Sequence, residues 1–353
     1  MAGITIRGAV KRFPAFTLGP IDIDIKSGEF FGVFGPPSSG KTSILKLILG
    51  LLRPDEGRVE FDGVDASNLD VDSRGISMVF QNLALFPHMT GRENIIFPLA
   101  ERGRPESEIA ERLDFVSEVL HVSHILHKNP AQMSGGERQR IALGRAFAAQ
   151  SQAMLLDEPI AALDARLREE MRVELKRLQR ENNQTFVYVS HDEEEVLAIS
   201  DRVAVVIEGK IAQLGTPAEV YDTPNCLAVA KVIGSPPMNF FAGSCTADGK
   251  GFEAKVLMGP LQLGQSMAAQ QPLTVGVRPE DIWINRNGSA PNARATVTSC
   301  EPLGSYTIVN AKLADQLLKI RVQGQVSFAF NEGIELFFDE RRLHIFEADG
   351  QRK

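Results

Sequence analysis

Cysteine is scarce in this chain. Only three cysteines occur among 353 residues, Cys226, Cys245 and Cys300, and they lie far apart with no C-x-x-C pair. Disulfide-rich secreted scaffolds and most zinc sites require closely spaced cysteines. The sequence therefore argues against both kinds of site and favours a protein of a reducing compartment.

Long hydrophobic runs are absent as well. The longest apolar stretch, residues 44–52, contains Lys46 and Gly50, whereas a membrane helix needs roughly 20 apolar residues in succession. Residues 1–13 alternate like a β-strand and lack the apolar run of a signal peptide. If the protein serves a membrane, we expect it to do so from the surface, through partner proteins.

No block of like charge stands out. The 38 basic and 45 acidic residues give a formal net charge of −7, whereas proteins that bind nucleic acid are more often basic. The N-K-x-D motif that marks GTPases is also missing. We therefore expect neither DNA nor RNA as a partner, and the sequence does not favour a GTPase.

The length of the chain points to two domains, and the sequence pattern changes near residue 235. Over residues 1–235, short apolar β-runs alternate with helical patterns, which predicts an α/β domain with a parallel sheet. The β-runs include 30–34, 76–80, 153–156 and 185–189, and the helical patterns include 43–49, 106–118 and 138–149. Residues 84–150 form a mainly helical subdomain in this prediction.

After the change of sequence pattern at residues 234–237, β-runs follow one another without helical patterns between them. They include 273–277, 295–299, 317–322 and 334–338, and Gly, Asn and Pro separate them. This pattern predicts a second, all-β domain over residues 236–353, in the form of a small barrel.

A phosphate-binding loop is the strongest single motif. Residues 35–42 read G-P-P-S-S-G-K-T and fit the pattern G-x-x-x-x-G-K-[ST], between a predicted buried strand and an apolar helix. The glycines let backbone N–H groups approach phosphate oxygens at a helix N-terminus. Lys41 would reach the β- and γ-phosphates, and Thr42 would bind Mg²⁺. The predicted ATP-binding residues of this segment are Gly35, Pro36, Pro37, Ser38, Ser39, Gly40, Lys41, Thr42 and Ser43.

Two carboxylates end the apolar run 153–156. Asp157 and Glu158 would lie beside the phosphate loop, because the carboxyl ends of parallel strands meet at one edge of a sheet. In that position Asp157 would hold Mg²⁺, and Glu158 would polarise the attacking water as general base. An acidic helix start is the alternative interpretation, and the phosphate loop upstream favours the catalytic one.

Residues 134–137 read S-G-G-E and open a helical pattern that continues to residue 149. Ser134 with Glu137 three positions later matches a capping box. A helix N-terminus that carries Gly135 and Gly136 is also suited to binding an anion. On local grounds alone, an ordinary capped helix is the simpler interpretation.

Residues 133–140, M-S-G-G-E-R-Q-R, resemble the signature of ATP-binding cassette (ABC) transporter ATPases. Further family marks appear in order: Gln81 resembles the Q-loop residue, Asp164 the D-loop residue, His191 the switch histidine and Phe13 the aromatic residue that stacks on adenine. The resemblance covers residues 4–235 and implies a P-loop NTPase ABC cassette that hydrolyses Mg-ATP. It implies catalytic roles for Lys41, Gln81, Glu158 and His191, and a Mg²⁺ site with Thr42, Gln81 and Asp157.

Alternatives remain open at two of these positions. Phe16 lies close to Phe13 in the sequence, and either ring could belong to the core. His191 lies in S-H-D-E, where Ser190 and Glu193 match a second capping box. His191 would then be a helix-start residue on local grounds, whereas the family resemblance implies a phosphate sensor.

Members of this family pair head to tail. The resemblance therefore implies that Ser134 and Gly136 of one subunit contact the γ-phosphate bound by the other. It also implies two transmembrane permease subunits and, indirectly, a solute-binding protein as partners, at the cytoplasmic face of the bacterial inner membrane. The apolar segment 83–89 would form a groove that faces the permease, and a helical-domain core is the alternative.

Four residues depart from the usual family pattern. Pro37 and Ser39 replace commoner loop residues, and Pro37 removes one backbone N–H from the phosphate cradle. Glu137 stands where glutamine is commonest, and Ala161 stands where a serine usually precedes the D-loop. None of these changes removes a catalytic group, so we expect an active ATPase.

The C-terminal region resembles the TOBE-type domain of importer ATPases. The resemblance lies in V-G-V-R-P-E-D at 275–281 and in residues 234–240 and 338–346. Together these segments are similar to those of carbohydrate-uptake importers, including importers of maltose-like sugars and glycerol-3-phosphate. We therefore expect a sugar, a polyol or a derivative as cargo. Importers for iron, molybdate, sulfate or polyamines also carry such tails and remain alternatives.

Two other functional classes share some of these features. A DNA-repair or translation ATPase would also contain the cassette, but the long coiled coils, C-x-x-C hook or second cassette of those classes do not occur in the sequence. The β domain could also act as a regulatory module that senses an anion or a signalling partner. That role is compatible with transport.

Overall fold

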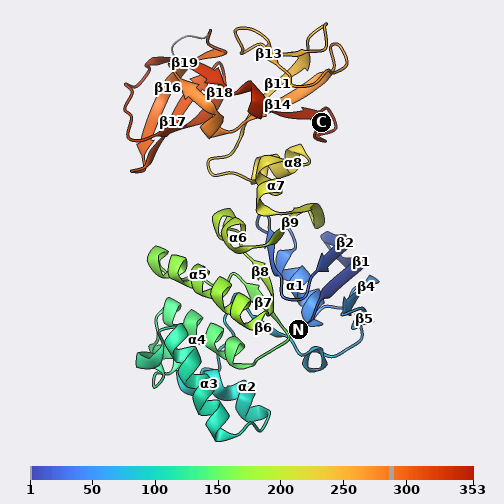
Figure 1. Ribbon diagram of the computed structural model, residues 1–353, viewed down its shortest axis with the longest axis vertical. Helices are drawn as coiled ribbons and strands as arrows, with labels where there is room; N and C mark the ends of the chain where they lie inside the picture. Colours follow the sequence, from blue (N-terminus) through green and yellow to red (C-terminus); the bar gives the residue numbers. More distant parts are fainter. Residues whose placement is uncertain (1, 286–289) are drawn as a thin grey trace. The chain divides into compact units, whose positions relative to one another are not determined.

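The computed structural model describes residues 2–285 and 290–353, and its contacts divide it into two compact units after Pro217 (Figure 1). The first unit contains two β-sheets together with its helices, and the second consists mainly of antiparallel β-strands. Both fold classes predicted from the sequence, an α/β cassette and an all-β region, are confirmed.

The central sheet of the first unit positions the predicted site. Its strand order is β10-β9-β3-β8-β7-β6, and every neighbouring pair is parallel except β9 with the edge strand β10. The strands are β3 (Phe30–Phe34), β6 (Ser77–Val79), β7 (Ala153–Asp157), β8 (Thr185–Val189), β9 (Arg202–Ile207) and β10 (Lys210–Gly215). Every residue of β3, β7 and β8 is buried, as expected for parallel strands covered on both faces.

An antiparallel sheet shares a core with the central sheet. It has the order β2-β1-β4-β5 and consists of β1 (Ile4–Phe13), β2 (Phe16–Ile25), β4 (Glu56–Phe61) and β5 (Val64–Asp65). Ile21, Ile23 and Ile25 are buried and alternate with exposed residues, which is the pattern of a strand with one covered face. They pack in one cluster with β3 and with helix α1 (Lys41–Leu49), so the start of α1 is held rigidly.

Helices α2 (Gly91–Glu101), α3 (Glu106–Val119) and α4 (Gly135–Ala148) form a helical region in which α4 contacts both of the others (Figure 1). Short 3-10 turns lie at Val71–Arg74, Ser123–Ile125 and Pro130–Gln132, and helices α5 (Ala165–Asn182) and α6 (Glu193–Ile199) follow the strands β7 and β8. No helix of the described residues is long and apolar enough to span a membrane.

The second unit contains two five-stranded antiparallel sheets, in the orders β13-β12-β11-β14-β20 and β15-β19-β16-β17-β18. Its elements are α7 (Pro217–Asp222), α8 (Leu227–Val232), β11 (Asn239–Cys245), β12 (Gly251–Glu253), β13 (Leu261–Gln262), β14 (Pro272–Val277), β15 (Ile282–Ile284), β16 (Ala293–Pro302), β17 (Tyr306–Leu313), β18 (Gln316–Gln323), β19 (Gly333–Phe338) and β20 (His344–Glu347), with 3-10 turns η4 (Pro279–Asp281) and η5 (Glu340–Arg342). Residues of both sheets contribute to one hydrophobic cluster.

The contacts divide the chain after Pro217, whereas the sequence predicted the border at residue 235. Helices α7 and α8 therefore belong to the second unit and not, as predicted, to the first. The buried side chain of Arg278 explains the difference. Its guanidinium donates to the carbonyl of Tyr221 and, over 3.2 Å, to that of Ile233. It also lies 3.6 Å from the centroid of the Tyr221 ring. These contacts join the two helices to the β-sheets through residues far along the chain, which local composition does not reveal.

Candidate active site

The phosphate loop runs from the end of β3 to the start of α1. Gly40 is the N-cap residue of α1 with φ 104°, and a Cβ atom there would lie 2.7 Å from Leu18 Cδ1. Both the left-handed backbone and the lack of space require glycine at this position. Ser39 is buried, and its hydroxyl has no hydrogen-bond partner among the described residues. The loop therefore presents a helix N-terminus and an unused hydroxyl donor, a combination suited to phosphate.

Lys41 lies inside this loop with its side chain largely buried. Its Nζ donates to the carbonyl oxygens of Gly35 at 2.8 Å and Pro36 at 2.9 Å. Burial lowers the pKa of Lys41, and the nearby carboxylates of Glu158 and Asp157 oppose that shift. An ammonium group under this burial penalty would be stabilised by an incoming phosphate.

Asp157 ends β7 against the first turn of α1. Its Oδ1 accepts a hydrogen bond from Thr42 Oγ1 over 3.2 Å, and its side chain is buried. Burial raises the pKa of Asp157, and the adjacent Glu158 raises it further. The hydroxyl and carboxylate oxygens are brought together here as predicted, and oxygen donors of this kind suit Mg²⁺.

Gln81 and His191 converge on Glu158, and each of the three residues follows a different strand of the central sheet. Glu158 Oε2 accepts a hydrogen bond from Gln81 Nε2 at 3.1 Å, and Glu158 Oε1 lies 3.0 Å from His191 Nδ1. The backbone of Glu158 is in the left-handed region, with φ 50°, and its N–H donates to the carbonyl of Val189 over 2.9 Å. A strained non-glycine residue held between two strand ends is common at functional sites.

A pocket of about 710 Å³ contains most of these groups. It is lined by Phe13, Phe16, Pro37, Ser38, Ser39, Gly40, Lys41, Thr42, Ser43, Gln81, Glu158 and His191. The rings of Phe13 and Phe16 are stacked with their centroids 6.0 Å apart. The structure therefore presents two aromatic rings beside the phosphate loop, where the sequence favoured Phe13 alone for adenine.

The predicted capping box from Ser190 to Glu193 is wrong. Helix α6 is capped by Asp192, whose Oδ1 accepts from the N–H of Glu195 at 3.2 Å. The Ser190 hydroxyl instead donates to the buried Glu195 carboxylate at 2.8 Å. The buried carboxylate needs hydrogen-bond donors, and this need determines where the hydroxyl points.

The predicted signature residues form the start of α4. Ser134 is the N-cap, with its Oγ accepting from the N–H of Glu137 at 3.2 Å, while Glu137 Oε2 accepts from the N–H of Ser134 at 2.6 Å. The predicted capping box is confirmed, and the helix begins at Gly135, directly after the predicted cap residue. A Cβ on Gly136 would lie 3.3 Å from Leu163 Cδ2.

Residues 134–137 and Asp164 are not among the described residues that line the pocket. Asp164 instead caps α5, with its Oδ1 accepting from the N–H of Leu167 at 3.0 Å. The chain therefore gathers the phosphate loop, Gln81, Glu158 and His191 at one site and leaves the start of α4 outside its lining.

Sequence reasoning missed Gln139, which joins the signature helix to the catalytic turn. Its buried side chain donates to the carbonyl of Glu158 at 3.1 Å and accepts from the N–H of Ala162 at 2.9 Å. The only signal in the sequence is a polar residue on the helix face that also carries Leu143 and Ala146. Through Gln139 the position of α4 is tied directly to the backbone of Glu158.

Arg145 was also missed, and it ties α4 to the segment after Gln81. Its guanidinium donates to the carbonyls of Ala84 at 2.8 Å and Leu83 at 3.1 Å, two residues with left-handed φ angles of 44° and 62°. It also lies 5.3 Å from the centroid of the Phe86 ring. The segment is partly buried, and its role as a permease-facing groove stays a prediction.

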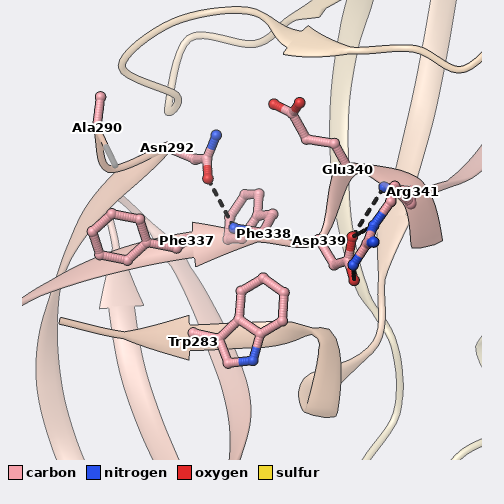
Figure 2. Close-up of a pocket in the computed structure, with 8 residues that line it drawn as sticks. All are labelled: Trp283, Ala290, Asn292, Phe337, Phe338, Asp339, Glu340 and Arg341. Atoms are coloured by element: carbon pink, nitrogen blue, oxygen red, sulfur yellow. Dashed lines mark hydrogen bonds and ion pairs between the residues drawn. The ribbon is translucent and has the colours of Figure 1, made fainter. Parts of the chain in front are cut away.

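A second pocket, of about 370 Å³, lies in the second unit between β15, β19 and η5 (Figure 2). Several of its polar groups are paired within the domain. The Asp339 carboxylate accepts from Arg341 at 3.0 and 3.1 Å, and Asn292 Oδ1 accepts from the N–H of Phe338 at 2.8 Å. It contains no residue that the sequence predicted for catalysis or ATP binding.

Three family models match the chain. They are the ABC transporter model over residues 18–161, the MalK OB fold domain over 234–282 and the TOBE domain over 275–346. The OB match begins near the predicted domain border. These matches support the resemblances to a cassette and to a TOBE-type tail.

Relatives and a solved structure agree with these matches. The sn-glycerol-3-phosphate import ATP-binding protein UgpC of Paraburkholderia xenovorans strain LB400 is 35% identical over 361 residues, which cover 100% of this chain and 99% of that protein. UgpC of Escherichia coli K12 is 36% identical over 358 residues, covering 100% of both. A dimeric post-hydrolysis structure of the ATP-binding cassette MJ0796 with ADP and Pi is 29% identical, with TM-score 0.57, and covers 61% of this chain and 98% of that one. The chain therefore belongs to the ATP-binding cassette transporter family, in the group of ATP-hydrolysing import subunits with a C-terminal TOBE domain.

Proposed function

We propose that this chain hydrolyses Mg-ATP at sites shared between two cassettes and thereby drives import of sn-glycerol-3-phosphate or a related polyol or sugar derivative. The observation that carries the catalytic part is the convergence of Gln81 and His191 on Glu158 beside the phosphate loop. The cargo class rests on the names of the full-length relatives.

Each residue of the pocket has a role in this proposal. Lys41 and the loop N–H groups hold the β- and γ-phosphates. Thr42, Asp157 and Gln81 would hold Mg²⁺, which would supply positive charge beside the phosphate oxygens. Glu158 takes a proton from the attacking water, and Gln81 and His191 orient its carboxylate through the contacts described above.

The adenine base stacks on Phe13 and Phe16 in this proposal. Because the two rings are already stacked on each other, the base would add to an existing aromatic surface rather than order a mobile side chain. Ser38, Ser39, Gly40 and Ser43 complete the contacts to the phosphates from the loop and the first turn of α1.

The start of α4 supplies the other wall of the site from a second copy. Its N-terminus, with Gly135 and Gly136, is an anion-binding end that is absent from the lining of its own pocket. The similar cassette structures are dimeric, which supports the pairing of two copies that this arrangement requires. Asp164 lies in the same region, and we propose that it also faces the second copy.

A mixture of two inactive variants tests the shared site. Lys41→Met disables the phosphate loop, and Gly136→Asp places a carboxylate at the anion-binding helix start. The new Cβ would lie 3.3 Å from the end of the Leu163 side chain, which must shift by a few tenths of an ångström to admit it. Each variant alone should be almost inactive. Random pairing leaves one of four sites intact, so the mixture should recover up to about a quarter of the wild-type ATPase rate.

A second mixture is the matched control. Lys41→Met and Glu158→Gln both damage the phosphate-loop side of the site, so no pairing restores an intact site and no activity should return. Equal inactivity of both mixtures would contradict the shared site, because Gly136 would then act on the nucleotide of its own chain.

Transport partners follow from the same assignment. We propose that two transmembrane permease subunits and a solute-binding protein complete the importer at the cytoplasmic face of the bacterial inner membrane. Importers of iron, molybdate, sulfate or polyamines are the alternative, since TOBE domains also occur there.

Deletion of the chain in its own host tests the cargo. Uptake of radiolabelled sn-glycerol-3-phosphate or a related polyol phosphate should be lost, and the wild-type chain should restore it, while Glu158→Gln should not. Uptake of sulfate and of polyamines should continue in the deletion strain. Loss of either of those, with sn-glycerol-3-phosphate uptake intact, would move the protein to the alternative class.

A further inference from the structure

The start of α4 carries a negative charge at the place proposed to receive a phosphate. Glu137 is the third residue of the helix, and its carboxylate uses Oε2 to accept from the N–H of Ser134. A carboxylate there stabilises the helix end by opposing its dipole. It also repels a triphosphate that approaches the same N–H groups, because like charges at short range disfavour each other.

Lys128 forms an ion pair with Glu137. Its Nζ donates to Glu137 Oε1 at 2.9 Å, and no other cation of the described chain lies within ion-pair distance of Glu137. The backbone of Lys128 is itself fixed, since its N–H donates to the carbonyl of Ile125 at 3.0 Å and its carbonyl accepts from the N–H of Gly91 at 2.9 Å. Both side chains keep low solvent exposure, 32% for Lys128 and 16% for Glu137.

Protonation cannot relieve the repulsion instead. The hydrogen bond from Lys128 and then that from the Ser134 N–H lower the pKa of Glu137 to about 2. Glu137 is therefore ionised at every pH at which the protein works, and the helix end keeps its negative charge. A neighbouring cation is the side chain that can neutralise this full negative charge.

We propose that Lys128 is a positioning residue that neutralises Glu137, so that the N-terminus of α4 accepts a phosphate of a nucleotide held by a second copy of the chain. This inference rests on the shared site proposed above. In this proposal Lys128 acts only through Glu137. A general contribution of Lys128 to folding or to net charge would not depend on Glu137.

A double-mutant cycle measures this dependence. Lys128→Met keeps the apolar stem and removes the charge, and Glu137→Gln keeps the shape of the carboxylate and its hydrogen bond to Ser134. Both are placed in the Glu158→Gln background, so that ATP-driven dimerisation is measured without hydrolysis. Lys128→Met should weaken ATP-driven dimerisation by about 5- to 10-fold when Glu137 is present, and by less than about twofold when it is glutamine.

Lys176→Met is the control. It removes the same charge from a lysine on α5, whose Nζ donates to Asp201 Oδ1 at 2.7 Å. It should leave the ATP dependence unchanged. The salt dependence provides a second readout: the defect of Lys128→Met should shrink as ionic strength rises, since screening weakens the uncompensated repulsion.

The outcomes separate this inference from the proposed function. Suppose that the Glu158→Gln parent dimerises, and that Lys128→Met weakens dimerisation equally with glutamate and with glutamine at position 137, or in neither case. Either result would overturn the role of Lys128 and leave the shared site standing. Failure of the Glu158→Gln parent to dimerise with ATP at any concentration would overturn the shared site and the role of Lys128 together.

Discussion

Replacement of Glu158 with glutamine is expected to lower ATP turnover by about 10²- to 10⁴-fold while ATP binding stays close to that of the wild type. The amide keeps the length of the carboxylate, and its oxygen can still accept the hydrogen bond from Gln81, which spans 3.1 Å in the wild type. The change removes a group that can take a proton from water. Steady-state hydrolysis and equilibrium nucleotide titration measure the two quantities separately.

Glu158→Asp is the matched control for this variant. It keeps the base but withdraws the carboxylate by one methylene group from His191, whose Nδ1 lies 3.0 Å from Glu158 Oε1. Its turnover should fall between those of the wild type and the glutamine variant. A glutamine variant that retained turnover within about tenfold of the wild type would exclude Glu158 as the base, since general-base catalysis is worth more than that.

Much of the candidate site was predictable because its determinants are local. At Gly40 the backbone needs φ 104° and has no room for a Cβ, and such a position selects glycine in any sequence that keeps the loop. Gln81, Glu158 and His191 each follow an apolar run that becomes a strand. Parallel strands place their carboxyl ends at one edge, so the order along the chain already implied a shared location.

Contacts between distant segments were not predictable in this way. Gln139 and Arg145 read as polar residues of an amphipathic helix, and their partners are backbone groups near Glu158 and Leu83 that only the packed fold brings close. The same limit explains the capping of α6, since the buried carboxylate of Glu195 redirects the Ser190 hydroxyl. Local preference is a weak guide wherever a buried polar group must be satisfied.

The position of the signature helix shows where pattern and structure are both needed. The residues S-G-G-E are compatible with an ordinary capped helix, and the capping box is indeed present. Only the geometry shows that this anion-binding end lies outside the lining of the pocket that holds Lys41 and Glu158. We propose that this helix end, suited to phosphate but absent from the lining of its own pocket, contacts the nucleotide that a second copy holds.

Replacement of Lys41 with methionine should weaken ATP binding by about 10²- to 10³-fold and leave the stability of the nucleotide-free protein nearly unchanged. The ammonium can make hydrogen bonds to phosphate oxygens that are each worth about 1.5–3 kcal/mol, and each 1.4 kcal/mol corresponds to about tenfold in affinity. Among the described residues, its acceptors are the carbonyls of Gly35 and Pro36. Methionine of similar length removes a buried charge that no carboxylate of the described residues pairs directly.

Calorimetric titration with ATP and thermal unfolding without nucleotide measure the two effects. The unfolding midpoint should move by no more than about 2 °C, equivalent to less than about 1 kcal/mol for a unit of this size. A large drop in midpoint would mean that Lys41 supports the loop rather than the ligand. Lys41→Arg, which keeps the charge but enlarges the head group, should retain more affinity than methionine.

The pH dependence gives an independent check on the same residue. Burial lowers the pKa of Lys41 from its usual 10.5, and bound phosphate would raise it again because it stabilises the charged form. Binding of ATP is therefore coupled to protonation of Lys41, and affinity should be lost as the pH rises through the lowered pKa of the free protein. The methionine variant cannot take up that proton, so its weaker affinity should stay flat over the alkaline range in which the wild type declines.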